Sequence, residues 1–186
     1  MKKLLPLIFV LILSSCSKEV PSSQLVERNG LTYELNSQEP FNGISVEYEG
    51  NELREKLTFK KGKLSGPFER YYSGGSLESK GEYVQEDFSD VGGDSGETVN
   101  GGLYEEYFVN GQLRMKGFLN PRTGEFDLDK EFIFFYSDGG MEQRNTPQSS
   151  SITYIEWFNP QGELVEGCVN FTNDESVDLS LCKDLN

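Results

Sequence analysis

The sequence predicts an all-β fold: an elongated meander of repeated β-hairpins that follows an N-terminal export signal. Three observations predict it. Short stretches rich in aromatic residues alternate with glycine-containing turns, a pattern typical of strands joined in hairpins. Similar stretches recur at intervals along the chain. Helical periodicity is absent beyond the first residues. We therefore expect hairpins that stack side by side.

The first residues have the three parts of a secretory signal peptide. The chain begins Met1-Lys2-Lys3, continues with an apolar run over residues 4–13, and reaches the small residues Ser14 and Ser15. A cationic start, an apolar core of roughly 7–15 residues and a small-residue cleavage site define such a signal. The apolar run is too short to span a bilayer, which needs about 20 residues.

The end of this signal indicates a lipid anchor. Leu13-Ser14-Ser15-Cys16 resembles the bacterial lipobox, in which the Cys thiol is alkylated with diacylglycerol before cleavage on its N-terminal side. The resemblance implies removal of residues 1–15, lipidation of Cys16 and anchoring to a membrane of the bacterial cell envelope. Ser17 stands where many inner-membrane lipoproteins have Asp, which favours an outer membrane if the cell has one. The alternative is an ordinary signal peptide followed by a chance Cys.

Residues 16–24 are expected to form a lipid-anchored tether, because they are polar and contain a Pro. Residues 25–186 then form one domain of ordinary size. Within it, residues 85–100 are an acidic, Gly-rich insertion that interrupts the pattern of strands.

Two segments of the domain repeat each other at a shift of 36 positions. Residues 66–81 (GPFERYYSGGSLESKG) and 102–117 (GLYEEYFVNGQLRMKG) share a glycine, an aromatic, a Glu, paired aromatics, Gly-x-Leu and Lys-Gly. Looser copies occupy residues 43–53, 132–141 and 155–164. The first of these is one residue shorter, and the last has one residue added to its turn.

Each copy is predicted to be a hairpin. Its strand residues alternate and are rich in aromatics, and its turn contains Gly or Asn-Gly, which suit the positive φ angles of tight turns. One hairpin cannot bury its own apolar face, whereas stacked neighbours can build a continuous core.

The repeated pattern resembles the variant MORN repeat. The stretch from about Leu25 to Leu119 is similar to the YwqK family of MORN-repeat proteins described as antitoxins, including the Asn29-Gly30-Leu31-Thr32-Tyr33 opening and the Glu39-Pro40-Phe41-Asn42-Gly43 segment that follows it. The resemblance implies an elongated, twisted, single-layered meander and says little about function. An antitoxin of this kind is expected in the cytosol, whereas this chain carries an export signal.

Charge and composition narrow the functional classes. The chain has 17 Lys and Arg against 31 Asp and Glu, a net charge of −14. Removal of residues 1–15 takes away Lys2 and Lys3 and no acid, so the mature chain carries −16. Such a chain repels nucleic acid, and its charge suits a basic partner or simply solubility in a charged envelope. The sequence has no His, so imidazole catalysis and His-ligated metals are excluded. We expect no enzymatic activity and no cofactor.

Two cysteines remain once Cys16 is assigned to the lipid. Cys168 and Cys182 would share an oxidising compartment, in which disulfides persist. A bond between them would close a loop of about 15 residues and contribute about 3 kcal/mol. Two buried thiols are the alternative.

Acidic residues gather in two places that can be considered for Ca²⁺. One group lies in the insertion and the other between the two cysteines, without the spacing of an EF-hand loop. Solvated loops are the simpler interpretation of both groups. Their members are Glu86, Asp87, Asp90, Asp94, Glu97, Asp174, Glu175 and Asp178.

Repeated aromatic residues suggest how the domain acts. Most should form the core of the stack, but adjacent aromatics point to opposite faces of a strand. We therefore expect Tyr72, Phe108, Tyr136 and Phe158 to form an interaction surface.

The expected function is a protein-interaction module that uses these aromatics or a strand edge. One alternative is an immunity or antitoxin protein that neutralises a basic toxin. Others are a glycan-binding protein and a hydrolase that uses two carboxylates about 5 to 9.5 Å apart.

Overall fold

The computed structural model describes residues 18–85, 98–120, 125–127, 129–149, 152–171 and 183–184. The predicted signal peptide, Cys16 and Cys182 lie outside these ranges, as do residues 86–97 of the insertion. Within them, the chain forms one twelve-stranded sheet and one separate two-stranded sheet.

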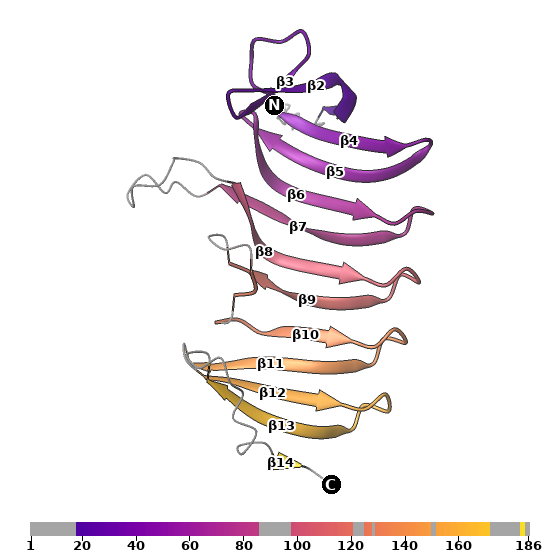
Figure 1. Ribbon diagram of the computed structural model, residues 1–186, viewed down its shortest axis with the longest axis vertical. Coiled ribbons are helices and arrows are strands. Elements are labelled where there is room, and N and C mark those ends of the chain that lie inside the picture. The colour runs from indigo at the N-terminus through magenta and orange to yellow at the C-terminus, as the bar shows by residue number, and fades with distance from the viewer. Residues whose placement is uncertain are drawn as a thin grey trace, which may run out of the picture.

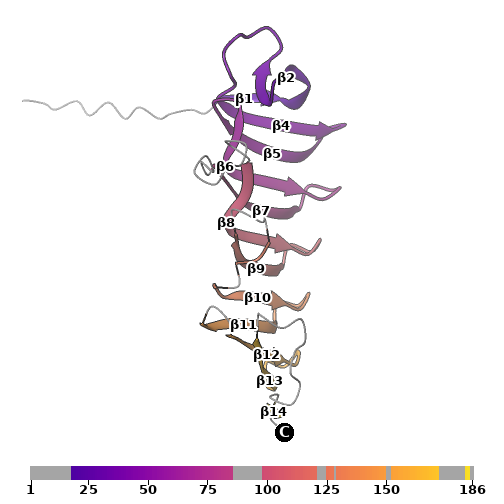
Figure 2. The same ribbon diagram turned by 60° about the vertical axis from the view of Figure 1, so that its left-hand side comes forward.

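In the large sheet, the strands from β4 to β14 lie side by side in chain order (Figure 1). Successive strands from β4 to β14 pair in antiparallel fashion, and the sheet does not close on itself. The view in Figure 2 shows the single layer twisting along its length. This architecture confirms the predicted all-β hairpin meander. Its strands are β4 (Gly43–Glu49), β5 (Glu52–Lys60), β6 (Lys63–Tyr71), β7 (Leu77–Gln85), β8 (Thr98–Tyr107), β9 (Leu113–Leu119), β10 (Phe132–Phe135), β11 (Met141–Ser149), β12 (Ile152–Phe158), β13 (Leu164–Phe171) and β14 (Lys183–Asp184).

The N-terminal end of the stack has a different construction. Strand β1 (Glu19–Pro21) pairs in parallel with β4, and a 3₁₀ turn, η1 (Ser22–Gln24), follows it. Strands β2 (Leu25–Arg28) and β3 (Leu31–Glu34) form the small sheet at the same end. Residues 19–24, expected in the tether, therefore belong to the fold. The physical reason is Val20, an apolar residue among polar neighbours whose side chain is only 2% exposed.

Four of the hairpins have the same turn. In each turn, the backbone carbonyl of the closing residue accepts a hydrogen bond from the N–H of a Gly three positions later. The N–H of the closing residue donates to the carbonyl of the residue after that Gly. These glycines have φ between +83° and +94°, which glycine adopts at little cost. The closing residues are Tyr72, Phe108, Tyr136 and Asn159, and the glycines are Gly75, Gly111, Gly139 and Gly162.

The shared turn corrects the expected alignment of the last copy. The turn after β12 has the same length as the others, so no residue is added there. Phe158 pairs with Leu164 as Tyr71 pairs with Leu77. The aromatic pair of this hairpin therefore begins one position earlier, at Trp157, and Asn159 occupies the second aromatic position. The first copy does have a shorter turn, because Tyr48 pairs with Leu53.

The two faces of the sheet differ in chemistry. One, the packed face, carries Phe68, Ser79, Met115, Asn145, Ile155 and Cys168, each 8% exposed or less. Aromatic rings cover it from neighbouring strands, as where the rings of Phe68 and Tyr83 lie 4.8 Å apart. The opposite face is the charged face, because a row of Lys and Glu register partners crosses it from β5 to β9.

Candidate functional site

The charged face carries a row of alternating charges across five strands. Its members are successive register partners on β5 to β9, namely Lys56, Glu69, Lys80, Glu105 and Lys116. The Nζ atom of Lys80 lies 2.7 Å from a carboxylate oxygen of Glu105. Hydrogen bonding to Glu105 raises the pKa of Lys80. Burial acts to raise the pKa of Glu105, but hydrogen bonds from Lys80 and Tyr107 bring it below its ordinary value.

The repeated Glu and first aromatic of the two strong copies form a hydrogen bond within each strand. The Tyr71 hydroxyl donates to Glu69, and the Tyr107 hydroxyl donates to Glu105. Burial, together with the adjacent carboxylate, raises the pKa of Tyr71 to about 12. Sequence reasoning missed this role, although the shared Glu-x-Tyr spacing was its signal, because residues two apart in a strand face the same side.

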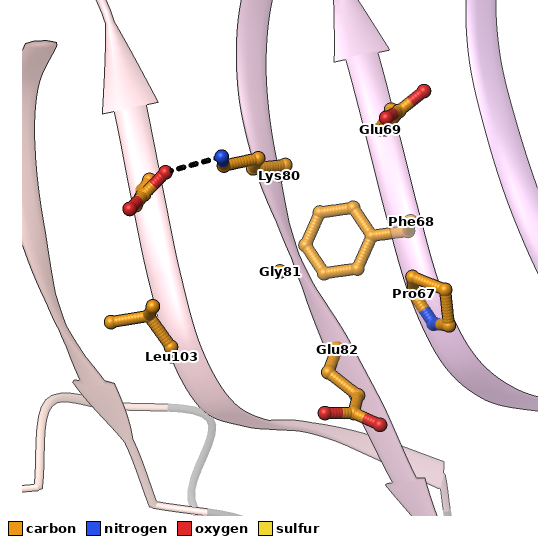
Figure 3. Close-up of a pocket in the computed structure, with 8 residues that line it drawn as sticks. Pro67, Phe68, Glu69, Lys80, Gly81, Glu82 and Leu103 are labelled. Carbon is orange, nitrogen blue, oxygen red and sulfur yellow. Dashed lines mark ion pairs between the residues drawn. The ribbon is translucent and has the colours of Figure 1, made fainter.

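A hollow of about 350 Å³ lies on the charged face over β6, β7 and β8 (Figure 3). It forms where the ladder is irregular. Between the pairs Lys80–Glu105 and Glu82–Gly101, β7 has one residue, Gly81, and β8 has residues 102–104. The extra residues make a bulge. On the packed face beneath it, the Phe68 ring lies against Gly81, where a Cβ atom would come within 2.8 Å of the ring.

Apolar side chains adjoin the hollow on its β8 side. Leu103, which lines it, is 47% exposed. Its register partner on β9 is Phe118, which is 37% exposed. The Nζ atom of Lys130 lies 4.7 Å from the centre of the Phe118 ring. Two neighbouring apolar residues are therefore presented to solvent on a face that is otherwise charged.

The four aromatics expected to form an interaction surface lie beside the hairpin turns, and all are half-buried. The Tyr72 hydroxyl donates to the Tyr107 carbonyl at 2.8 Å, and the Tyr136 hydroxyl donates to the Phe158 carbonyl at 2.8 Å. Each tyrosine thus joins its hairpin to the next one in the stack. Phe108 occupies the same position between them without a hydroxyl. Their assignment to an interaction surface stays a prediction.

The cysteines are only partly described. Cys168 lies on β13 and is fully buried. No disulfide pair is found among the residues that the structure describes. Cys182 lies outside them, so the bond between Cys168 and Cys182 stays a prediction. Lipidation of Cys16 stays one for the same reason.

Metal and membrane-spanning features are reported for the described ranges alone. Within them, no three His, Cys, Asp or Glu residues group as metal ligands. The acidic groups considered for Ca²⁺ lie outside these ranges, so calcium binding stays a hypothesis. Helices of the length and apolar character that crossing a bilayer requires are absent from the described part of the chain.

Comparison with known proteins gives no family. No protein-family model matches the chain, and no curated protein matches it. The fold itself is therefore the firmest basis for function: an all-β chain with a long antiparallel meander sheet.

Proposed function

We propose that this protein is a lipid-anchored, non-enzymatic protein of a bacterial cell envelope whose hairpin-repeat sheet binds another protein. The observation that carries the proposal is the exposed pair Leu103 and Phe118 on the charged face of a single-layer sheet. Apolar residues that gather on a surface with polar surroundings mark sites of protein interaction. The open sheet provides a wide area for such a contact.

The anchor rests on the N-terminal sequence. The signal-like residues 1–15 and the lipobox-like residues before Cys16 support lipidation. Expression in a bacterial host, with a Cys16→Ser variant as control, tests it. The wild-type chain should be found in the membrane fraction with the mass of acyl chains added to residue 16. Equal membrane association of the variant would contradict the lipid anchor.

We further propose that the hairpins are variant MORN repeats of the YwqK type. Support comes from four turns with the same backbone hydrogen bonds, each with a Gly at positive φ and three of them closed by an aromatic residue. Strands stacked in chain order agree with such repeats. This assignment leaves the partner open, because repeat architectures serve many functions.

A second candidate is an immunity or antitoxin protein for a basic toxin. The net charge of −14 favours it, since opposite charge speeds association and makes it sensitive to salt. A basic partner gained at low salt and lost at high salt would support this candidate. A partner retained through high salt would favour apolar contacts instead.

Affinity purification from envelope extracts tests the interaction itself. The full lipidated chain, carrying a C-terminal tag, is captured at low and at high salt, with the tagged Leu103→Glu variant as control. We expect a protein retained by the wild-type chain and depleted from the variant, because a buried carboxylate replaces an apolar contact. No protein retained by the wild-type chain under either condition would count against an interaction role.

A further inference from the structure

The hollow on the charged face combines apolar walls with carboxylates. Pro67 and Leu103 supply apolar surface, and Glu69, Glu82 and Glu105 supply acids. The cation among the lining residues is Lys80, whose ammonium lies 2.7 Å from Glu105. Lys56 and Lys116 are the register partners of Glu69 and Glu105 on the outer strands, so Glu82 is the lining acid with no lysine as its register partner.

The three carboxylates differ in what they already bind. Glu105 accepts from Lys80 and Tyr107, and Glu69 accepts from Tyr71. Glu82 is exposed at the rim beside its register partner Pro67, and it makes no hydrogen bond or ion pair with the residues that the structure describes. It is the acid best placed to receive a cation from outside.

The shape and charge together select one kind of occupant. A lysine or arginine side chain has an apolar stem and a charged end. Its stem can pack on Pro67 and Leu103, while its cation reaches Glu82 at the rim. The exposed ring of Phe118 continues the apolar surface across β9. The occupant's neighbouring apolar side chains can pack there.

We propose that this hollow binds a lysine or arginine side chain of a basic, amphipathic segment in a partner protein. The proposal rests on the protein-interaction function and adds to it the site and the chemistry of the partner. Complementary charge argues for this occupant, because the chain carries −14 overall and Glu82 at the rim has no cation partner among the described residues. An acidic segment would be repelled by the same groups.

A labelled peptide provides the direct test. The lipidated chain is placed in nanodiscs of zwitterionic phosphatidylcholine, and empty nanodiscs give the background. The probe is a fluorescein-labelled peptide of alternating Lys and Leu, followed by fluorescence anisotropy. The same peptide with Glu in place of each Lys is the control for charge. We expect saturable binding of the Lys peptide and none of the Glu peptide.

Charge-reversal variants then locate the site. Glu82→Lys should weaken binding of the Lys peptide about tenfold, as expected on loss of a charge-assisted contact. The matched control is Glu142→Lys, an exposed acid on β11, which changes the net charge equally and should weaken binding less than about twofold. Leu103→Ser should weaken it several-fold through lost apolar contact. The unfolding midpoint of each variant verifies its fold.

The outcomes separate this proposal from the broader function. Equal weakening by Glu82→Lys and Glu142→Lys would overturn it, because net charge would then explain the binding. Absence of saturable binding, or equal binding of the Glu peptide, would also overturn it. A partner captured from envelope extracts in spite of either result would leave the interaction function standing with a different site.

Discussion

At the scale of single residues, tyrosine hydroxyls connect successive hairpins. Tyr72 and Tyr136 each donate to a backbone carbonyl of the following hairpin. Phe108 has the equivalent position in the hairpin between them. There the equivalent acceptor is the carbonyl of Phe135, one residue before the next closing residue.

Phe108→Tyr is therefore expected to stabilise the fold. A hydroxyl at this position should reach the Phe135 carbonyl and add about 0.5–1.5 kcal/mol to the free energy of unfolding. The hairpin tips are close enough, because Asn110 already donates to the Ser137 carbonyl at 2.8 Å. Urea unfolding measures the change. Tyr72→Phe is the matched control and should lose a similar amount. No gain in Phe108→Tyr, alongside a loss in Tyr72→Phe, would show that these two hairpins stack less closely.

Tyrosine ionisation should make the fold sensitive to alkali. The pKa of Tyr71 is raised from 10.0 to about 12, first by burial and then by Glu69. The folded state therefore favours the neutral phenol. Its contribution is complete below pH 10 and is lost as the pH rises toward about 12. Lys80, whose pKa is also raised, acts in the same direction. The free energy of urea unfolding, measured across this range, should decline less steeply in Tyr71→Phe, and an unchanged slope would contradict the assignment.

Residue roles were the least predictable part of the sequence. The repeated Glu and Tyr are evident in the sequence, but their hydrogen bond depends on which side chains share a face of the strand. The exposure of Leu103 depends on the bulge between β7 and β8, and no local sequence motif predicted this bulge. The four aromatics expected to form a surface lie beside the turns, and the backbone bonds of Tyr72 and Tyr136 depend on the spacing between hairpins.

At the scale of elements, the recurrent turn fixes how each hairpin closes. Its Gly has positive φ in all four hairpins that share the turn. A Cβ atom added at Gly111 would meet no other atom within 4 Å. Any cost of substitution there comes from the backbone conformation rather than from crowding.

Gly111→Ala tests this element. With φ at +83°, alanine should reduce the free energy of unfolding by about 1–2 kcal/mol. Gly111→Asn is the control and should lose less, since Asn tolerates this region. Thermal and urea unfolding of both variants measure the difference. An equal loss for Ala and Asn would point to a contact with the side chain instead of the backbone conformation.

Hairpins with strong turn signals were predictable because turn and strand signals lie close together in the sequence. Residues 66–81 and 102–117 are such cases, and their strands are β6–β7 and β8–β9. Among the features that the sequence did not predict, one turn and one strand were missed for different reasons. The turn near Asn159 was misaligned because its aromatic pair, Trp157 and Phe158, lies one position earlier than the pairs of the other hairpins. The sequence shows the aromatic residues but not which residue makes the hydrogen bonds of the turn. Strand β1 escaped notice because its pairing with β4 is parallel and distant in sequence.

At the scale of the whole molecule, stability is expected to depend on both ends of the stack. The C-terminal end contains Cys168, fully buried on β13. If Cys168 and Cys182 are bonded, the mature chain should show no titratable thiol in denaturant without reductant. Cys182→Ser should then expose one thiol and lose about 3 kcal/mol of unfolding free energy. Two thiols in the unreduced wild-type chain would refute the bond.

The N-terminal end gives the molecule a mechanical property. Glu19, the first residue of β1, lies three positions after Cys16. Tension on a lipid at Cys16 would enter the fold at Lys18, whose carbonyl accepts a hydrogen bond from Ile44 and whose ammonium lies 2.6 Å from Glu34. It would then reach the three register pairs that join β1 to β4. Rupture of these pairs would lengthen the tether between the lipid and the sheet by up to about 3.3–3.6 Å per released residue. The hairpins would stay intact. Release of β1 would also expose the edge of β4, whose backbone groups would then be free to pair with another strand.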